Sequence, residues 1–316
     1  MCELLSEWFS HNGNTSDAPD IDIKCTGKNY LSTMDFDIRN IHTAIKTLKP
    51  NSSSGADDIP SIVYKMSGPD IQTLLLKIYT LSLETGTYPE TQKVTYVLLK
   101  HKSRPRNLVE NYRPINITPV ISRIMEKVIE NQLSDNLLKE DLIDPSQHGF
   151  IRTRSCSTCL TDFFNEVTRI RDQKKLVIIL YFDIKKAFDK VPHNLLINRL
   201  KSVGIINPLL QWIKSFLTNR YQITKINSNT STPRPITSGV LQRSVLGSLL
   251  FIIYINNICK CFNTVVDNYH YFDLAHELTL ITPFINQQAV HLRNIKNSRL
   301  MHWIAVIYLL LKQLLN

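Results

Sequence analysis

The sequence lacks the features that mark secreted, zinc-binding and membrane-spanning proteins. Its first seven residues are acidic and contain no apolar core, so we expect an intracellular protein with reduced thiols. No basic localisation cluster decides between nucleus and cytoplasm. Cys156 and Cys159 have the spacing of half a zinc site, but the pair Cys259 and Cys261 is wrongly spaced to complete it. The apolar run at 303–311 is too short to cross a bilayer, which argues against a membrane partner.

Glycine is scarce, with 9 residues among 316, and no repeat or low-complexity tract is present. Hydrophobic residues make up 43% of the chain, which is typical of a globular protein rather than a disordered one. The formal net charge of +10 indicates a polyanionic partner, most often a nucleic acid. Charge alone does not separate nucleic acid from an anionic membrane surface, and nothing in the sequence indicates an oligomeric state.

Helix and strand patterns mix without strict alternation, which predicts an α+β fold. Start signals for helices stand at Asp37, Pro69, Thr118-Pro119 and Asn207-Pro208. Strands are predicted at 94–99 and, as a hairpin, from 221 to about 240. The residues expected inside the four helices are Ile41, Ala44, Ile45 and Leu48; Leu74, Leu75, Ile78 and Leu81; Val120, Ile121, Ile124, Met125, Val128, Ile129 and Leu133; and Leu209, Leu210, Ile213, Phe216 and Leu217.

The most apolar stretch in the middle of the chain, 176–182, ends at Asp183. A continuous β-branched and aromatic run of this length predicts a strand that is buried on both faces. A carboxylate at the end of such a strand is held on a rigid element and is suited to bind a metal ion. The plainer interpretation, that Asp183 is a turn residue or a helix cap, applies to most isolated aspartates.

Four segments carry polar residues in a fixed order around this strand. They read NYRPI at 111–115, QHGFIRTRS at 147–155, FDIKKAFDKVPH at 182–193 and GVLQRSVLGSLLF at 239–251. Together they resemble the reverse transcriptases of retrotransposons that lack long terminal repeats, the LINE-like and jockey-like elements. The resemblance covers about 36–281.

The resemblance implies a right-hand polymerase fold with fingers and palm, in which an antiparallel palm sheet is flanked by helices. It divides the chain into a linker remnant (1–30), a fingers-like region (31–175), a palm (176–285) and a degenerate tail (286–316) whose thumb is missing or rudimentary. The implied activity is RNA-templated DNA synthesis by two-metal nucleotidyl transfer with Mg²⁺. The implied partners are an RNA template, a DNA primer and deoxynucleoside triphosphates.

By the same resemblance, several residues receive roles. Asp183 binds metal together with the backbone of the following turn, and Asp189 braces that turn. Phe188 lies under the sugar and selects deoxynucleotides, unless it is an ordinary core phenylalanine. Other positions bind the nucleotide or the template. The nucleotide is bound by Arg113, Gln242 and Lys102, or alternatively Lys100, and template phosphates are contacted by Arg152 and Arg154.

The sequence departs from the family pattern where a paired Asp-Asp should follow the palm strand. One alignment puts His276 and Glu277 at these positions, and a second puts Asp273 and Leu274 there; the first is preferred because Ala275 and the downstream strand also match. Imidazole is a poor ligand for magnesium, so we expect an incomplete metal site with Asp183 and Glu277 as ligands. Arg243 replaces a glycine beside the nucleotide. Impaired catalysis, or an inactive nucleic-acid-binding relic, is therefore expected.

Overall fold

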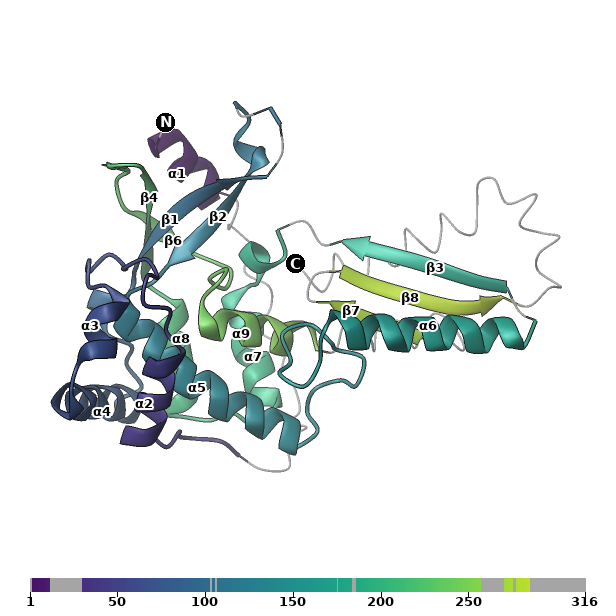
Figure 1. Ribbon diagram of the computed structural model, residues 1–316, viewed down its shortest axis with the longest axis horizontal. Helices are drawn as coiled ribbons and strands as arrows, with labels where there is room; N and C mark the ends of the chain where they lie inside the picture. Colours follow the sequence, from purple (N-terminus) through teal and green to yellow (C-terminus); the bar gives the residue numbers. More distant parts are fainter. Residues whose placement is uncertain are drawn as a thin grey trace. The chain divides into compact units, whose positions relative to one another are not determined.

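The computed structural model describes residues 2–11, 30–102, 104–105, 107–174, 176–183, 186–256, 270–274 and 277–284. Figure 1 shows the helices and strands of these segments. They form two compact units, which are described separately. The larger unit comes from 1–142 and 188–251, and the smaller unit from 143–187 and 252–316. The apolar run at 303–311 lies outside the described residues.

The larger unit is built on a mixed sheet in the order β2-β1-β4-β5, with β6 also paired to β4. β1 is antiparallel to β2 and parallel to β4, while β4 forms the predicted hairpin with β5 and β6. The prediction of an antiparallel palm sheet is therefore only partly matched, because β1 and β4 run in the same direction in this mixed sheet. The strands are β1 (Val94–His101), β2 (Tyr112–Ile117), β4 (Arg220–Ile226), β5 (Asn229–Thr230) and β6 (Arg234–Ile236).

Helices supply most of the apolar core of the larger unit. Helix α1, in residues expected to belong to a linker, packs against β4 and β6. α5 packs against α2, and α8 packs against α4 and α7. The helices are α1 (Cys2–His11), α2 (Ile38–Thr47), α3 (Ser61–Met66), α4 (Pro69–Glu84), α5 (Val120–Lys139), α7 (His193–Ser202), α8 (Leu209–Leu217) and α9 (Val245–Ile255), with short 3₁₀ turns η1 (Glu90–Gln92), η2 (Val109–Asn111) and η3 (Phe188–Lys190).

The start signals of the helices were predicted with mixed success. The carboxylate of Asp37 accepts a hydrogen bond from the backbone N–H of Asn40 at 2.6 Å, so the cap of α2 is confirmed. α5 begins at Val120, and Pro119 is its cap residue rather than its first helical residue. The predicted buried stripe of α5 is confirmed except at Ile121, which is half-buried.

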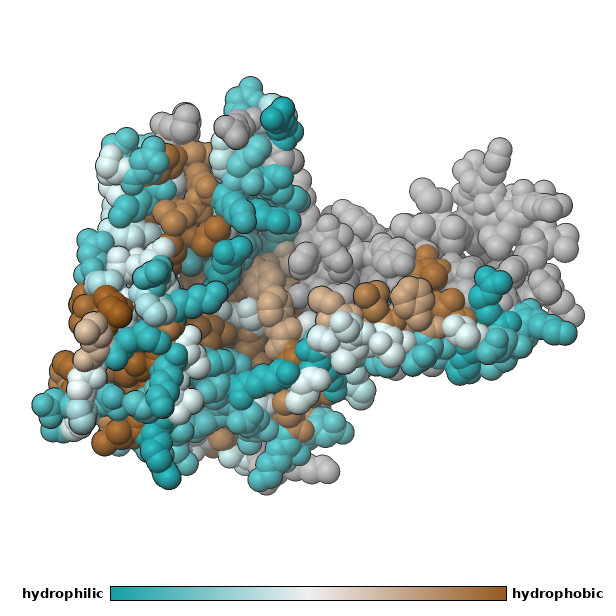
Figure 2. Space-filling model, viewed as in Figure 1, coloured by the Kyte–Doolittle hydropathy of each residue, from teal (hydrophilic) through white to brown (hydrophobic). Residues whose placement is uncertain are grey.

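The prediction for the buried face of α4 was wrong at two positions. Leu74 and Leu81 are 52% and 62% exposed, and the helix instead buries Leu75, Tyr79 and Leu83. α4 is apolar around most of its circumference, so periodicity alone could not choose the face that packs against α2 and α8. In Figure 2 the apolar surface of α3 and α4 is visible as brown patches.

The smaller unit is a three-stranded antiparallel sheet in the order β3-β8-β7, with one helix packed on β3 and β7. β3 confirms the strand predicted to end at Asp183. Ser155 caps the helix, and Cys159 and Ile170 form its buried core with Phe163 and Val167. The elements are α6 (Cys156–Asp172), β3 (Leu176–Asp183), β7 (His270–Leu274) and β8 (Glu277–Phe284).

The fold is a mixture of helices and strands in which sheets are flanked by helices, as the sequence predicts. In the part of the chain that the structure describes, no helix is both long enough and apolar enough to span a membrane.

Candidate active site

The last residue of β3 lies opposite the first residue of β8 in the small sheet. In the strand register Asp183 pairs with Glu277, which pairs in turn with Leu274 of β7. These residues form one row across the sheet. Asp273 belongs to the neighbouring row, since it pairs with Leu278. The backbone thus brings Asp183 and Glu277 into register, one row away from Asp273.

Both alignments proposed for the missing Asp-Asp pair fall on β7, β8 and the two residues between them. Ala275 and His276 lie outside the described residues, as do residues 184 and 185 of the turn expected to supply a backbone ligand. Among the described residues, no three His, Cys, Asp or Glu side chains gather as a metal site. The roles of Asp183, Glu277 and Asp273 stay predictions.

Two of the sequence motifs meet in the larger unit, at the turn containing Phe188 and the loop containing Gly239. The backbone N–H of Gly239 donates to the carbonyl of Val191 at 2.8 Å, and that of Val240 donates to the carbonyl of Phe188 at 2.9 Å. Two backbone hydrogen bonds therefore fix one end of the loop against the turn.

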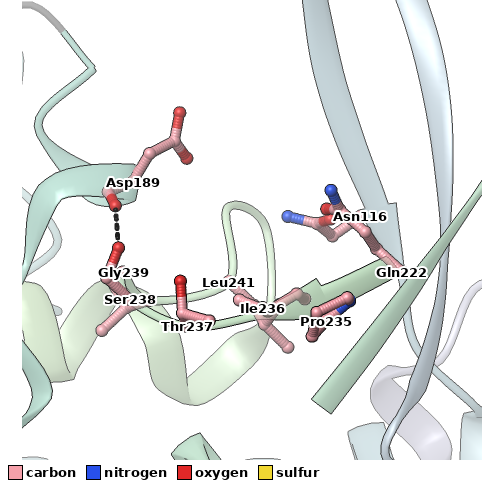
Figure 3. Close-up of a pocket in the computed structure, with 10 residues that line it drawn as sticks. Asn116, Asp189, Gln222, Pro235, Ile236, Thr237, Ser238, Gly239 and Leu241 are labelled. Atoms are coloured by element: carbon pink, nitrogen blue, oxygen red, sulfur yellow. Dashed lines mark hydrogen bonds between the residues drawn. The ribbon is translucent and has the colours of Figure 1, made fainter. Parts of the chain in front are cut away.

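Asp189 joins the same turn to the side chain of Gln242. The Nε2 group of Gln242 donates to Oδ1 of Asp189 at 3.2 Å. The hydroxyl of Ser238 donates to the Asp189 carbonyl at 3.1 Å, as the dashed line in Figure 3 marks. A carboxylate that accepts from Gln242 orients this amide. The geometry agrees with the interpretation of Asp189 as a brace of the turn.

A small pocket of about 50 Å³ opens beside this junction (Figure 3). Asp189 lies on one side, and the carboxamides of Asn116 and Gln222 lie on the other. The backbone of 235–241 forms its floor. Neither Asn116 nor Gln222 was predicted from the sequence, because β2 and β4 carry other polar residues and no local signal distinguishes these two amides.

Gly239 occupies a position that only glycine fits. Its φ of +86° lies in the left-handed region, and a Cβ atom there would stand 2.8 Å from the carbonyl oxygens of both Phe188 and Asp189. Nε2 of His193 donates to the Gly239 carbonyl at 2.8 Å. The N–H and the carbonyl of Gly239 are therefore both hydrogen-bonded, to Val191 and to His193.

Burial lowers the pKa of His193, and the hydrogen bond to Gly239 offsets only part of this shift. As the pH falls, His193 becomes protonated in the unfolded chain before it does so in the folded protein. The contribution of neutral His193 to the free energy of unfolding is therefore complete above the ordinary histidine pKa of about 6.5 and is lost as the pH falls below it. We expect His193→Gln, which keeps a donor but does not titrate, to reduce the pH dependence of unfolding between pH 7 and 5 by up to about one proton. Urea unfolding at several pH values measures this; equal slopes in both proteins contradict it.

The ring of Phe188 stacks on Phe251, with ring centroids 4.3 Å apart and an interplanar angle of 20°. Phe251 is buried at 1% exposure, whereas Phe188 is half-buried. A core partner therefore fixes the ring of Phe188 from one side. Both of the interpretations offered for this residue, sugar contact and core packing, are compatible with this stacking.

The basic residues near the nucleotide motif lie at the end of the β1–β2 pair. Arg113 is exposed on β2 and pairs directly with Lys100 of β1, which is also exposed. Lys102 follows the strand, and its backbone N–H donates to the carbonyl of Asn111 at 2.7 Å. Sequence reasoning preferred Lys102, but Lys100 is the cation that the strand register places beside Arg113.

The two arginines expected to contact template lie in different environments. Nη1 of Arg154 donates to the carbonyls of Asp144 and Gln147 at 2.9 and 2.6 Å, so this half-buried side chain braces a loop. Arg152 is exposed. Exposure and charge make Arg152 the better candidate for a phosphate contact.

Arg243 adopts the backbone conformation that favours glycine, with a φ of +68°. Its side chain is exposed, one residue after Gln242. Arg243 therefore holds a backbone conformation that glycine adopts more readily, at the position where the family pattern has glycine.

Arg243→Gly is expected to stabilise the fold by about 0.5–1 kcal/mol, because relief of the left-handed strain exceeds the entropy that glycine adds to the unfolded chain. Asn227→Gly is the matched control: Asn227 also has a positive φ, of 56°, but asparagine tolerates this conformation. Urea unfolding of both variants measures the difference. A destabilised Arg243→Gly protein contradicts the prediction.

Comparison with known proteins agrees with this arrangement of motifs. A family model described as reverse transcriptase (RNA-dependent DNA polymerase) matches residues 99–298. The chain is 28% identical over 218 residues to the probable RNA-directed DNA polymerase from transposon BS of Drosophila melanogaster, which covers 69% of this chain and 24% of the relative. It is 26% identical over 223 residues to the RNA-directed DNA polymerase from mobile element jockey of the same species, which covers 70% of this chain and 24% of the relative.

The chain belongs to the reverse transcriptase family, since the family model spans more than half of its length. It is a reverse transcriptase domain of the type found in retrotransposons without long terminal repeats. The chain spans about a quarter of the length of these two relatives.

Proposed function

We propose that this domain catalyses RNA-templated addition of deoxynucleotides to a DNA primer, at a rate limited by an incomplete metal site. The observation that carries this proposal is the row formed by Asp183 and Glu277 across β3 and β8. In the proposed right-hand architecture, residues 31–175 form the fingers and 176–285 the palm. Membership of the reverse transcriptase family supports both statements.

The donor set fits one hard divalent cation. Magnesium prefers carboxylate oxygens, and Asp183 and Glu277 supply two carboxylates from directly paired positions. Successive residues of a strand alternate between its two faces, so the row assignment favours Glu277 over Asp273 as the partner of Asp183. His276 offers no oxygen ligand for a second ion. A single bound Mg²⁺ would supply only part of this two-metal chemistry, which consists of lowering the pKa of the primer 3′-hydroxyl and stabilising the leaving pyrophosphate.

Residues of the larger unit are proposed to bind the nucleotide. Arg113, with Lys100 or Lys102, would contact the triphosphate through charge-assisted hydrogen bonds. Gln242 would lie beside the nucleotide in the orientation that Asp189 fixes. Template phosphates would be contacted by Arg152.

Primer extension on poly(rA)·oligo(dT) with dTTP tests this function, in magnesium and in manganese. The proposal expects slow extension that depends on the metal ion and is lost in Asp183→Asn. Folded protein that yields no product in either metal contradicts it.

A second candidate function, nucleic-acid binding without catalysis, is favoured by the net charge of +10 and by Arg243 at the glycine position. It predicts an affinity for RNA or DNA that falls steeply with salt, because bound cations release counterions from the phosphates. Titration of labelled poly(rA)·oligo(dT) between 50 and 200 mM salt measures this. Binding that is absent or independent of salt excludes the second candidate.

A further inference from the structure

Glu126 is a carboxylate with no exposed surface, on a helix that carries none of the residues assigned to the site. Its Oε2 atom accepts a hydrogen bond from the backbone N–H of Leu246 at 3.2 Å, and the N–H of Val245 also donates to this carboxylate. Both amides belong to the first turn of α9. These N–H groups have no partner within their own helix, and Glu126 satisfies them from α5.

A buried chain of hydroxyl groups holds the other side of this carboxylate. The Ser122 hydroxyl donates to Oε1 of Glu126 at 2.9 Å, so it accepts the hydrogen bond it shares with the hydroxyl of Tyr88. Burial raises the pKa of Tyr88 to about 12, which keeps this donor protonated. Behind it, the guanidinium of Arg220 lies 5.4 Å from the Tyr88 ring centroid. Glu126 is thus bonded to Ser122 of its own helix and, through Ser122, linked to Tyr88 in the loop that follows α4.

The first turn of α9 is continuous with the loop that carries Gln242. One end of this loop is tied to the turn of Phe188 through Gly239 and Val240. The other end enters α9, where the Ser244 hydroxyl accepts from the N–H of Gly247 at 2.9 Å. Without Glu126, the buried amides at this end would lose their partner, at a cost typical of unsatisfied buried groups.

We infer that Glu126 is a positioning residue of the nucleotide site. By holding the amino end of α9, it fixes the 239–244 loop and hence the place of Gln242. Only the last step of this inference, the effect on nucleotide binding, rests on the proposed function.

Hydrogen–deuterium exchange of Glu126→Gln tests the anchoring directly and needs no activity. The neutral amide keeps the size of the side chain but cannot accept from all its present donors. We expect the peptide spanning 239–250 to exchange at least about tenfold faster, while the peptide of β1 keeps its rate. Glu130→Gln, on the same helix, is the matched control, because Glu130 pairs with Lys127 at 2.7 Å. It is expected to leave the 239–250 peptide unchanged.

Unchanged exchange at 239–250, or equal acceleration of all peptides, overturns the inference. If Glu126→Gln does not fold, Glu126→Asp replaces it, since the shorter side chain keeps the charge and withdraws it from the α9 amides. The same local acceleration is expected of that variant, and its absence overturns the inference.

A second measurement links the anchor to Gln242. In dTTP binding to the complex with poly(rA)·oligo(dT), Glu126→Gln should weaken affinity about tenfold in the parent protein but less than twofold in a Gln242→Ala background. Independent effects would contradict positioning through Gln242. A parent protein that binds no dTTP contradicts the proposed function instead. The hydrogen–deuterium exchange data then test by themselves whether Glu126 holds the first turn of α9.

Discussion

The double variant His276→Asp, Glu277→Asp is expected to extend a primer at least about 100-fold faster than the parent protein, which corresponds to about 2.7 kcal/mol in the activation free energy. The substitutions give the Asp-Asp pair of the family pattern: position 276 gains a carboxylate, and position 277 exchanges the longer Glu side chain for Asp. Asp183 pairs with position 277 in the register of β3 and β8, so the new pair includes the position directly opposite Asp183. Initial rates on poly(rA)·oligo(dT) in magnesium measure the gain.

The control for this gain is Asp183→Asn in the same double variant. If the restored carboxylates act with Asp183, the added substitution should return the rate to that of the parent protein or below. A double variant that is no faster than the parent would place the metal site elsewhere, since a site beside Asp183 needs residues 276 and 277 to complete it.

Gly239→Ala is expected to destabilise the larger unit by about 2–4 kcal/mol. An alanine Cβ would lie 2.8 Å from two carbonyl oxygens, and the φ of +86° is unfavourable for any L side chain. Relief of the clash requires the loop to move away from the turn of Phe188, which would break the hydrogen bonds that align Gln242. Equilibrium unfolding in urea measures the loss of stability, and dTTP affinity measures the loss of alignment.

Gly68→Ala is the matched control, because a Cβ at Gly68 has no atom within 4 Å and its φ is −77°. As the cap residue of α4, Gly68 contributes a modest preference, so this substitution should cost at most about 1 kcal/mol. Equal losses in the two variants would show that the contact between loop and turn does not constrain Gly239.

Much of the fold near the site could be predicted because its signals are local. The apolar run before Asp183 specified a strand, and Asp37 specified a helix start, without reference to any other part of the chain. The face that α4 buries could not be predicted from local sequence, since Leu74 and Leu75 are equally apolar. Only the packing of α2 and α8 against this helix makes Leu75 buried and leaves Leu74 exposed. The direction of β4 relative to β1 likewise depends on the path of the chain between them.

In the candidate site too, some features follow from local sequence and others only from tertiary folding. The motif around Gln242 and the turn at Asp189 could be recognised from residue order, yet their hydrogen bond is a product of tertiary folding. The pairing of Lys100 with Arg113 could not be predicted, because spacing along a chain does not give strand register. Glu126 carried no signal beyond an acidic residue beside a buried stripe, and its contact with α9 joins residues that are far apart in sequence.

The central claim is that Asp183 and Glu277 together hold a divalent cation. Titration with Mn²⁺ in the presence of poly(rA)·oligo(dT), followed by electron paramagnetic resonance, tests it most directly. The account predicts one bound ion per chain in the parent protein, with affinity reduced at least about tenfold in Asp183→Asn and in Glu277→Gln but not in Asp273→Asn. Manganese affinity that is unaffected by Asp183→Asn and Glu277→Gln would contradict it.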